Sequence, residues 1–301
     1  MSRPRRALVT GAGGFTGRYL VRELQEQGWE VWGLGNTLPA MSGECFVQAD
    51  LLDAQGLQVA VEKVAPDAVF HLAAIAFVGH GSPADFYQVN LIGTRNLLQA
   101  LAALDRPPQS VLLASSANVY GNAAEGALNE ATPFNPANDY AVSKTAMEMM
   151  ARLWQDRLPL VVVRPFNYTG VGQALDFLVP KIVDHFRRRA DIIELGNLQV
   201  WRDFSDVRDV VRAYRLLVDV CPAGQTVNIC SGRAHSLLEV LDMARSITGH
   251  DLEVQVNPAF VRASEVKTLY GDTDLLAQLL GGWSPRAFPD TLRWMLQDTT
   301  F

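Results

Sequence analysis

Short, largely apolar segments alternate with longer amphipathic segments through the first half of the chain. Five of the short segments are predicted strands, at residues 7–10, 30–34, 68–72, 111–114 and 160–163. Continuous apolar runs of this length are typical of strands that are buried on both faces of a parallel sheet. Because segments of helical periodicity lie between them, the pattern predicts an α/β fold with a Rossmann-type doubly wound parallel sheet.

Capping residues indicate where several helices begin and end. Ser236 and Glu239 have the spacing of a capping box and open a helix that Gly249 would end. Gly28 likewise closes an amphipathic helix that begins near Gly14. Further helices are predicted to begin at the Ser-Pro-Ala-Asp sequence 82–85 and to run near 274–280 and 290–297.

The pattern becomes less regular after about residue 166, although 226–230 still has the character of a core strand. At 301 residues the chain exceeds the size at which one hydrophobic core usually keeps growing. We therefore expect a dinucleotide-binding domain over 1–165 that also receives about 192–230. The remainder of 166–301 would mainly form a smaller α/β substrate-binding lobe.

Composition and charge restrict the class of protein. A formal net charge of −6 argues against a nucleic-acid-binding protein, which would normally present a concentrated basic face. No apolar run is long enough for a membrane span, and none has the form of a signal peptide. The three cysteines follow no disulfide or metal spacing, and the five histidines form no zinc motif. We expect a cytoplasmic protein with no metal.

A glycine-rich turn joins the first predicted strand to the first predicted helix. Gly11, Gly14 and Gly17 stand where a tight turn, close approach to a pyrophosphate and close helix packing each require a residue without a Cβ. The helix N-terminus adds amide donors and a positive partial charge for the phosphates. The order of strand, glycines and helix predicts a dinucleotide site; a purely structural turn is the alternative.

Tyr140 and Lys144 are four residues apart, so on a helix their side chains share a face. The pKa of a free tyrosine is about 10, too high for proton transfer at neutral pH. A lysine charge at roughly 5–6 Å would lower the pKa of the phenol by up to about two units. The alternative is an exposed helix pair without a chemical role. Ser116, at the end of a predicted strand, would hydrogen-bond the reacting oxygen.

These motifs, in this order and spacing, resemble those of extended short-chain dehydrogenases/reductases, the NAD-dependent epimerases and dehydratases, over nearly the whole chain. The resemblance implies that Ser116, Tyr140 and Lys144 are catalytic. It implies dimers or higher homo-oligomers formed through helices spanning 83–104 and 138–156. The residues that it places on the cofactor are Gly11, Gly14, Phe15, Thr16, Gly17, Asp50, Leu51, Leu72, Ala73, Ala74, Tyr140 and Lys144.

One position departs from the pattern for NAD. Gly35 follows the second predicted strand, where an acid usually hydrogen-bonds the adenosine ribose. Without a carboxylate there, a 2′-phosphate is not repelled, so NADP(H) becomes admissible. Asn36 and Thr37 offer no cation, and Arg18 is the nearest candidate in sequence. We favour NADP(H) over NAD(H).

The residues after Ser116 restrict the reaction. Sugar-nucleotide 4,6-dehydratases of the resembled family have an Asp-Glu pair there, and enzymes that epimerise and then reduce have a cysteine two places after the serine. This chain has Ala117 and Asn118, neither of which can transfer a proton. Hydride transfer at a single carbon remains.

The segment 196–210 indicates the substrate class. It resembles the corresponding stretch of GDP-mannose 4,6-dehydratases and GDP-4-keto-6-deoxy-D-mannose reductases, and of these two only the reductases lack the acid pair. Guanidinium groups suit a diphosphate, although an ion pair with a neighbouring aspartate is the alternative role for Arg202. The substrate contacts that the resemblance implies are Ser116, Asn167, Lys181, Arg202, Arg262 and Glu265.

We therefore expect a reductase that transfers hydride from NAD(P)H to C4 of a GDP-4-keto-6-deoxy-hexose, giving GDP-D-rhamnose or its C4 epimer. One alternative is a nucleotide-sugar 4-epimerase that uses the same residues with tightly bound NAD. Another is a non-catalytic NADP-binding sensor, a class that typically lacks the tyrosine or the lysine.

Overall fold

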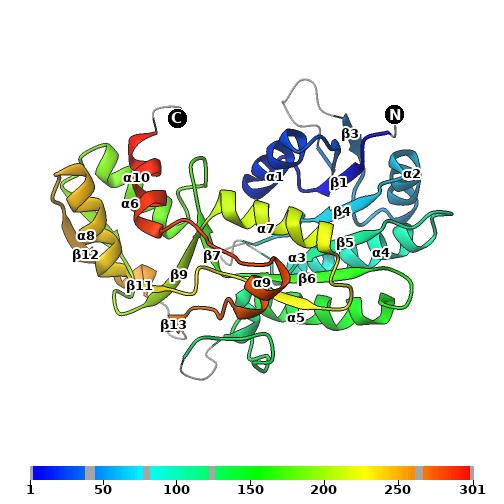
Figure 1. Cartoon of the computed structure of the whole chain (residues 1–301). Coiled ribbons are helices and arrows are strands. Elements are labelled where there is room, and N and C mark those ends of the chain that lie inside the picture. The colour runs from blue at the N-terminus through cyan, green and yellow to red at the C-terminus, as the bar shows by residue number, and fades with distance from the viewer. Residues whose placement is uncertain (1–2, 38–44, 77–81, 122–125, 262–266, 299–301) are drawn as a thin grey trace.

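The computed structural model describes residues 3–37, 45–76, 82–121, 126–261 and 267–298, and has two lobes (Figure 1). The large lobe contains a seven-stranded parallel sheet in the order β10-β6-β5-β4-β1-β2-β3. The predicted Rossmann-type sheet is therefore confirmed. Its strands are β1 (Arg6–Thr10), β2 (Glu30–Gly35), β3 (Cys45–Gln48), β4 (Ala68–His71), β5 (Ser110–Ala114), β6 (Leu160–Pro165) and β10 (Thr226–Ile229).

The edge strand β3 was not predicted from the sequence. Only Val47 of its four residues is buried, so the segment lacks the apolar run that marks the central strands. The other six strands coincide closely with predicted segments because both of their faces are covered. Neighbouring residues such as Leu8 and Val9 belong to different hydrophobic clusters on opposite faces of the sheet.

Helices pack on both faces of this sheet. On one face α1 (Phe15–Glu26) and α7 (Val207–Val220) form a common core with alternate strand residues. The opposite face is covered by α2 (Ala54–Val64), α4 (Thr94–Ala102) and α5 (Asp139–Ala151). The helix predicted to start at Pro83 is interrupted, because α3 (Pro83–Tyr87) continues into a π-helical segment, Gln88–Gly93, before α4.

The smaller lobe contains short strands with α-helices packed against them (Figure 1). Strand β9 (Trp201–Asp206) pairs with β7 (Asn167–Thr169), β11 (Ala234–Ser236) and β13 (Thr268–Leu269), while β8 (Ile192–Leu195) pairs with β12 (Glu253–Val256). The helices are α6 (Leu178–Arg187), α8 (Leu237–Thr248) and α10 (Phe288–Gln297). The capping box of Ser236 and Glu239 is present at the start of α8, and Gly249 ends that helix as predicted.

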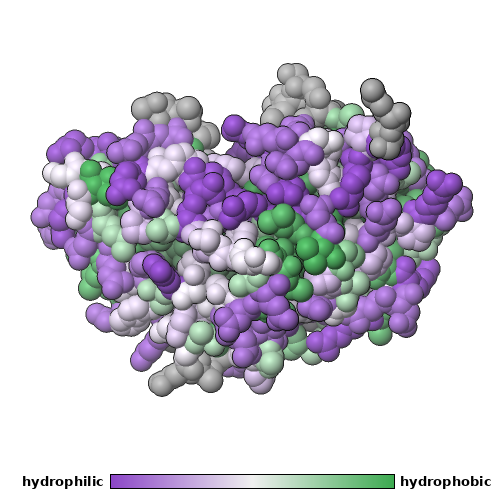
Figure 2. All heavy atoms as spheres, in the orientation of Figure 1, coloured by the Kyte–Doolittle hydropathy of each residue, from purple (hydrophilic) through white to green (hydrophobic). Residues whose placement is uncertain are grey.

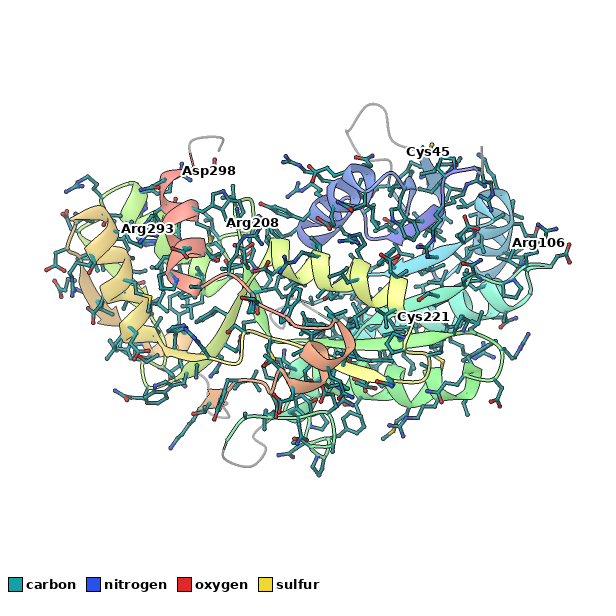
Figure 3. The ribbon with its side chains drawn as sticks, viewed as in Figure 1. Cys45, Arg106, Arg208, Cys221, Arg293 and Asp298 are labelled. Atoms are coloured by element: carbon teal, nitrogen blue, oxygen red, sulfur yellow. The ribbon has the colours of Figure 1, made fainter. Side chains whose placement is uncertain are left out.

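The chain passes between the lobes more than once. Within the range of about 192–230 expected to return to the dinucleotide domain, β8 and β9 lie in the small sheets, whereas α7 and β10 pack on or join the large one. Helix α9 (Asp274–Leu279) contributes Leu276 to the core of the large lobe. Arg208, at the start of α7, lies where the two lobes meet (Figure 3).

The surface agrees with the composition. Figure 2 shows hydrophilic side chains over much of both lobes, and a group of hydrophobic ones over the end of α7 and beside α9. No helix within the described residues is long and apolar enough to span a membrane. Cys45, Cys221 and Cys230 are unpaired, and Figure 3 shows Cys45 and Cys221 on separate parts of the large lobe.

Candidate active site

A cavity of about 390 Å³ lies at the carboxyl edge of the large sheet, against the smaller lobe. The register of the parallel strands brings the ends of β1, β4, β5 and β6 to this edge, since Thr10 pairs with His71 and Ala114 with Val163. Open α/β sheets commonly bind ligands at this edge. The predicted site residues that line the cavity are Gly11, Gly14, Phe15, Thr16, Gly17, Leu72, Ala74, Ser116, Tyr140, Lys144 and Asn167.

Two glycines of the loop before α1 occupy positions that exclude a side chain. Gly11 has a φ of +71°, and a Cβ there would lie 2.9 Å from the backbone nitrogen of Ala73. A Cβ on Gly17 would lie 2.2 Å from the carbonyl oxygen of Gly11. Gly14 precedes α1 without a capping side chain, so the loop presents backbone to the cavity. This cradle fits the diphosphate of a dinucleotide.

A buried histidine, His71, links the end of β1 to the start of α4 beneath the glycine loop. His71 Nδ1 lies 2.7 Å from Thr10 Oγ1, and His71 Nε2 lies 2.8 Å from Thr94 Oγ1. Burial lowers the pKa of His71 to about 3, so the ring is neutral at physiological pH. Thr10 Oγ1 also accepts a hydrogen bond from the Ala73 amide at 3.1 Å, which holds the segment after β4 against the loop.

Asn90, to which the sequence assigned no role, links two walls of the cavity. It sits in the π-helical segment, where its amide donates to the Ser143 hydroxyl at 3.0 Å and accepts from the Ile75 amide at 2.9 Å. Its side chain thereby ties the segment after β4 to α5. A buried polar residue within an otherwise apolar helical stretch was the signal that could have indicated this role.

Tyr140 and Ser116 meet at the base of the cavity. Tyr140 lies in the first turn of α5, which Asn138 caps by accepting from the Ala141 amide. Ser116 follows β5, and both side chains line the cavity. Burial raises the pKa of Tyr140 to about 12, although the neighbouring Ser116 hydroxyl acts in the opposite direction. The phenol is therefore protonated at neutral pH.

Lys144 lies one turn after Tyr140 on the same helix, as the spacing predicted, and its effect on the tyrosine differs from our expectation. Its side chain is buried. Its ammonium donates to the Ala114 carbonyl at 2.7 Å. Burial lowers the pKa of Lys144 to about 8, against an opposing effect of Glu148. The predicted lowering of the tyrosine pKa is wrong for the protein alone, because the cost of burying a phenolate exceeds the other effects.

Three predicted cofactor residues lie outside the lining of the cavity. Asp50 is exposed and accepts from the Leu52 amide, and the Leu51 carbonyl accepts from Asn96. Ala73 instead contacts the cradle at Gly11. Arg18, the cation considered for a 2′-phosphate, donates to the Gly172 carbonyl at 3.4 Å.

The predicted substrate residues are divided between the cavity and its surroundings. Asn167 lines the cavity, and its buried Nδ2 has no hydrogen-bond partner within the described chain. An unsatisfied buried donor is costly, so this atom suits a ligand oxygen. Lys181 donates to the Glu194 carbonyl, and Arg202 to the carbonyls of Trp201 and Lys267, outside the lining. Arg262 and Glu265 lie outside the described residues.

Residues 7–230 match the model of the NAD dependent epimerase/dehydratase family, which covers well over half of the chain. The chain belongs to this family. The match includes the glycine loop, Ser116, Tyr140 and Lys144, so the family assignment and the geometry of the cavity concern the same part of the molecule.

Two relatives within the family act on sugar nucleotides by name. GDP-6-deoxy-D-talose 4-dehydrogenase of Aggregatibacter actinomycetemcomitans is 37% identical over 277 residues, 91% of this chain and 90% of that one. GDP-6-deoxy-D-mannose reductase of Pseudomonas aeruginosa is 35% identical over 306 residues, 97% of this chain and 96% of that one.

Two solved structures share the fold over nearly the full length. A candidate epimerase from Burkholderia cenocepacia J2315 is 52% identical, with a TM-score of 0.93 and 98% of each chain covered. RMD from Pseudomonas aeruginosa complexed with NADPH is 33% identical, with a TM-score of 0.84, and the match covers 97% of this chain and 96% of that one.

The cavity has few groups that can transfer a proton. Ala117 is buried away from it, and Asn118, which lines it, donates its backbone amide to Ser116 Oγ at 3.2 Å. Of the described residues that line the cavity, none is an aspartate, glutamate, histidine or cysteine. Tyr140, with Ser116 and Lys144 beside it in the same lining, is therefore the candidate for proton transfer at this position.

Proposed function

We propose that this protein uses NAD(P)H to reduce the C4 keto group of a GDP-4-keto-6-deoxy-hexose, giving GDP-D-rhamnose or its C4 epimer. The observation that carries the proposal is that Ser116, Tyr140, Lys144 and the glycine loop line one cavity, with no carboxylate or imidazole among its described lining. Dehydration requires an acid and a base in addition to the tyrosine. Reduction at one carbon requires only a hydride and one proton.

Glycines at 11 and 17 allow the loop and the start of α1 to pack closely against neighbouring backbone, and the loop would hold the diphosphate of a dinucleotide. Phe15, Thr16 and Leu72 would form the remaining contacts from the same side. The bound nicotinamide would supply the hydride. Asp50, Leu51 and Ala73 are proposed contacts farther along the same cofactor.

Tyr140 would protonate the oxygen at C4 as the carbonyl is reduced. The phenol carries its proton at neutral pH, as a proton donor must, although burial makes it a weaker acid than a free tyrosine. Ser116 would hold the same oxygen through its hydroxyl, which lines the cavity beside Tyr140. Lys144, which donates to the Ala114 carbonyl, would bind the nicotinamide ribose. It would also supply a proton to Tyr140 after the tyrosine has protonated the substrate.

Two observations support GDP as the nucleotide of the substrate: the unsatisfied donor of Asn167 and the GDP sugars in the names of the two relatives. Asn167 Nδ2 would donate to a diphosphate oxygen. Lys181, Arg202, Arg262 and Glu265 remain proposed contacts of the nucleotide. For Arg202 this would require a change in the direction of its guanidinium, which donates to two backbone carbonyls through Nη1 in this structure.

We propose NADP(H) as the preferred cofactor. Gly35 ends β2 without the carboxylate that usually hydrogen-bonds the adenosine ribose, so this position does not repel a 2′-phosphate. The NADPH complex of the similar reductase supports the choice. Comparing kcat/KM for NADPH and NADH on one substrate tests it; a ratio below one would reverse the preference.

The function is tested by mixing the purified protein with GDP-4-keto-6-deoxy-D-mannose and NADPH. A reductase consumes NADPH in a one-to-one ratio with product, and the product's C4 configuration follows from NMR. A 4-epimerase with tightly bound NAD is the second candidate, favoured by the similarity to the Burkholderia candidate epimerase. It would interconvert C4 epimers without a change in NADPH absorbance. Binding of NADPH without turnover of any nucleotide sugar would support the sensor alternative.

A homodimer is proposed on the outer face of α5. Met149 is 52% exposed on that helix, and Leu153, directly after it, is 81% exposed. Apolar side chains grouped on one helix face favour contact with another chain. Light scattering of the purified protein should give twice the chain mass, and Leu153→Lys should shift it towards the monomer.

A further inference from the structure

Tyr168 is one residue from Asn167 and reaches the glycine cradle from the opposite lobe. Its hydroxyl lies 2.8 Å from Thr16 Oγ1, in the first turn of α1. Its ring is stacked on Phe15, with the centroids 6.3 Å apart and an angle of 11° between the planes. Tyr168, Thr16 and Phe15 all line the cavity. One two-residue stretch thus touches both the proposed diphosphate site and the dinucleotide loop.

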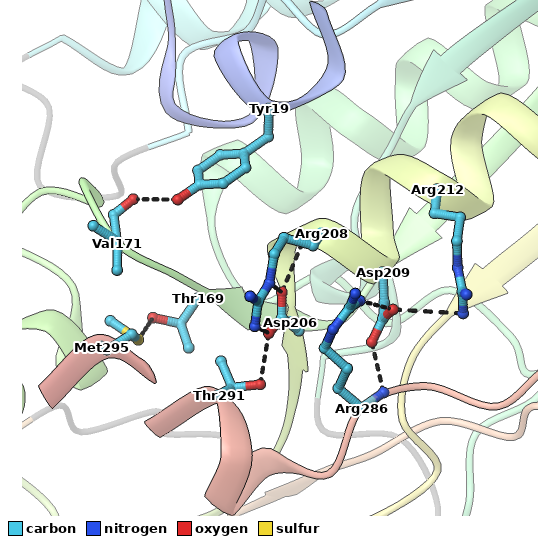
Figure 4. A network of polar contacts seen from close by, with 10 residues as sticks. All are labelled: Tyr19, Thr169, Val171, Asp206, Arg208, Asp209, Arg212, Arg286, Thr291 and Met295. Atoms are coloured by element: carbon cyan, nitrogen blue, oxygen red, sulfur yellow. Dashed lines mark hydrogen bonds and ion pairs between the residues drawn. The ribbon is translucent and has the colours of Figure 1, made fainter. Parts of the chain in front are cut away.

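The segment after Tyr168 is packed closely against the large lobe. Tyr19 donates its hydroxyl proton to the Val171 carbonyl at 2.8 Å, a bond visible in Figure 4. A Cβ on Gly170 would lie 2.5 Å from Val207 and 3.3 Å from Trp294, so this stretch has no room to slide past its neighbours. The segment that follows β7 is therefore held at a fixed position beside α1.

Strand β7 is also held firmly on the side of the smaller lobe. Thr169 pairs with Asp206 on β9. Asp206 in turn accepts from Arg208 at 2.6 Å and from the Thr291 hydroxyl at 2.8 Å, joining α7 and α10 (Figure 4). The bond between Tyr168 and Thr16 joins the residue next to Asn167 directly to the first turn of α1, while β7 itself is held in place from both lobes.

We propose that Tyr168 is a positioning residue that couples the two ligands, so that a nucleotide diphosphate at Asn167 tightens binding of the dinucleotide through Thr16. This inference rests on the proposed function. Thr16 is the second residue of α1, and amides in the first turn of a helix have no intrahelical partner and can face phosphate. Fixing the side chain of Thr16 orders this turn before the cofactor arrives, and linkage requires the effect to be reciprocal.

The experiment measures the Kd of NADPH by fluorescence titration, with and without saturating GDP. In the unaltered protein, GDP should lower the Kd of NADPH by about 5-fold or more. In the presence of GDP, Tyr168→Phe should raise the Kd of NADPH by about 2- to 12-fold, which corresponds to the loss of one hydrogen bond. It should also reduce the effect of GDP to less than about 2-fold, a change that a merely structural role would not produce. Thr16→Val, which keeps the branched shape, should do the same, and the double variant should be no worse than either single one.

Tyr19→Phe is the matched control, because it also removes one hydroxyl bond between α1 and the segment at 168–172. It should leave the effect of GDP unchanged. Equal loss in Tyr19→Phe, additive losses in the double variant, or an unchanged response to GDP in Tyr168→Phe would each overturn the assignment. Failure of the unaltered protein to bind NADPH at all would instead overturn the proposed function. If Tyr168→Phe does not fold, Thr16→Val alone decides the outcome.

Discussion

The carboxylate of Glu148 and the guanidinium of Arg164 form a two-pronged ion pair behind the proposed reaction site. Arg164 Nη2 lies 2.6 Å from Oε2 and Nε lies 2.9 Å from Oε1, and both side chains are 3% exposed. Glu148 is on α5 one turn after Lys144, and it also accepts a hydrogen bond from Ser115, the neighbour of Ser116. The pair thus joins the helix that carries Tyr140 to the strand ends that carry the serine.

Glu148→Gln should destabilise the protein by about 3–5 kcal/mol, because it leaves the Arg164 charge buried without its counter-ion. Urea unfolding at pH 7 measures the change. The double variant Glu148→Leu with Arg164→Met should recover most of this loss, since apolar pairs often replace buried ion pairs at little cost. A loss below about 1 kcal/mol for Glu148→Gln would show that the pair contributes little to the fold.

Tyr140→Phe should lower kcat by about 10²- to 10⁴-fold, since it removes the group that supplies the proton. The Kd of NADPH should change little, because the cradle is formed by the glycine loop. The measurement is stopped-flow loss of NADPH absorbance with the 4-keto substrate. Ser116→Ala, which leaves the phenol in place, should have a smaller effect. A Tyr140→Phe variant that keeps most of its activity would remove Tyr140 from the proton-transfer step.

Lys144→Met should lose activity and yet be more stable at pH 7. Burial lowers the pKa of Lys144 from 10.5 to about 8, so between these values the unfolded chain binds more protons than the folded one. Stability should therefore rise with pH from about 8 to 10.5, and below about 8 the full cost, on the order of 3 kcal/mol, is present.

The substitution removes the cost of burying the charge but also removes the hydrogen bond to the Ala114 carbonyl. The free energy of unfolding should therefore rise by about 1–2 kcal/mol. Urea unfolding of both proteins at pH 7 and pH 10 checks the gain and its decrease with pH. The exposed Lys63→Met is the control and should change stability by less than about 0.5 kcal/mol at either pH. A Lys144→Met variant that is less stable at pH 7 would contradict the assignment of a strained lysine.

Gly17→Ala should abolish NADPH binding or prevent folding, because its Cβ would lie 2.2 Å from the Gly11 carbonyl oxygen. Gly13→Ala is the matched control in the same loop, since a Cβ there has nothing within 4 Å in the protein. Isothermal titration with NADPH, together with thermal unfolding, separates the two effects. Equal affinities for the two variants would mean that the loop has more freedom than its geometry implies.

Local sequence was sufficient for much of the fold. Six strands of the large sheet were predictable because both of their faces are buried, which produces continuous apolar runs. The capping box of Ser236 and Glu239 acts within one helical turn, so it could also be predicted from the sequence. The edge strand β3 and the π-helical segment at Asn90 were not, because an exposed edge and a local change of helix type leave no periodic signal.

Some features of the candidate site could likewise be predicted from the sequence, and others could not. The sequence by itself determined the glycine cradle, the helical spacing of Tyr140 and Lys144, and the absence of an acid pair after Ser116, because each depends on residues close together in the chain. Only the tertiary structure decided that burial raises the pKa of Tyr140, that Glu148 meets Arg164, and that Tyr168 reaches Thr16 from the other lobe. Desolvation and long-range contacts depend on which surfaces the folded chain brings together, and no local pattern encodes them.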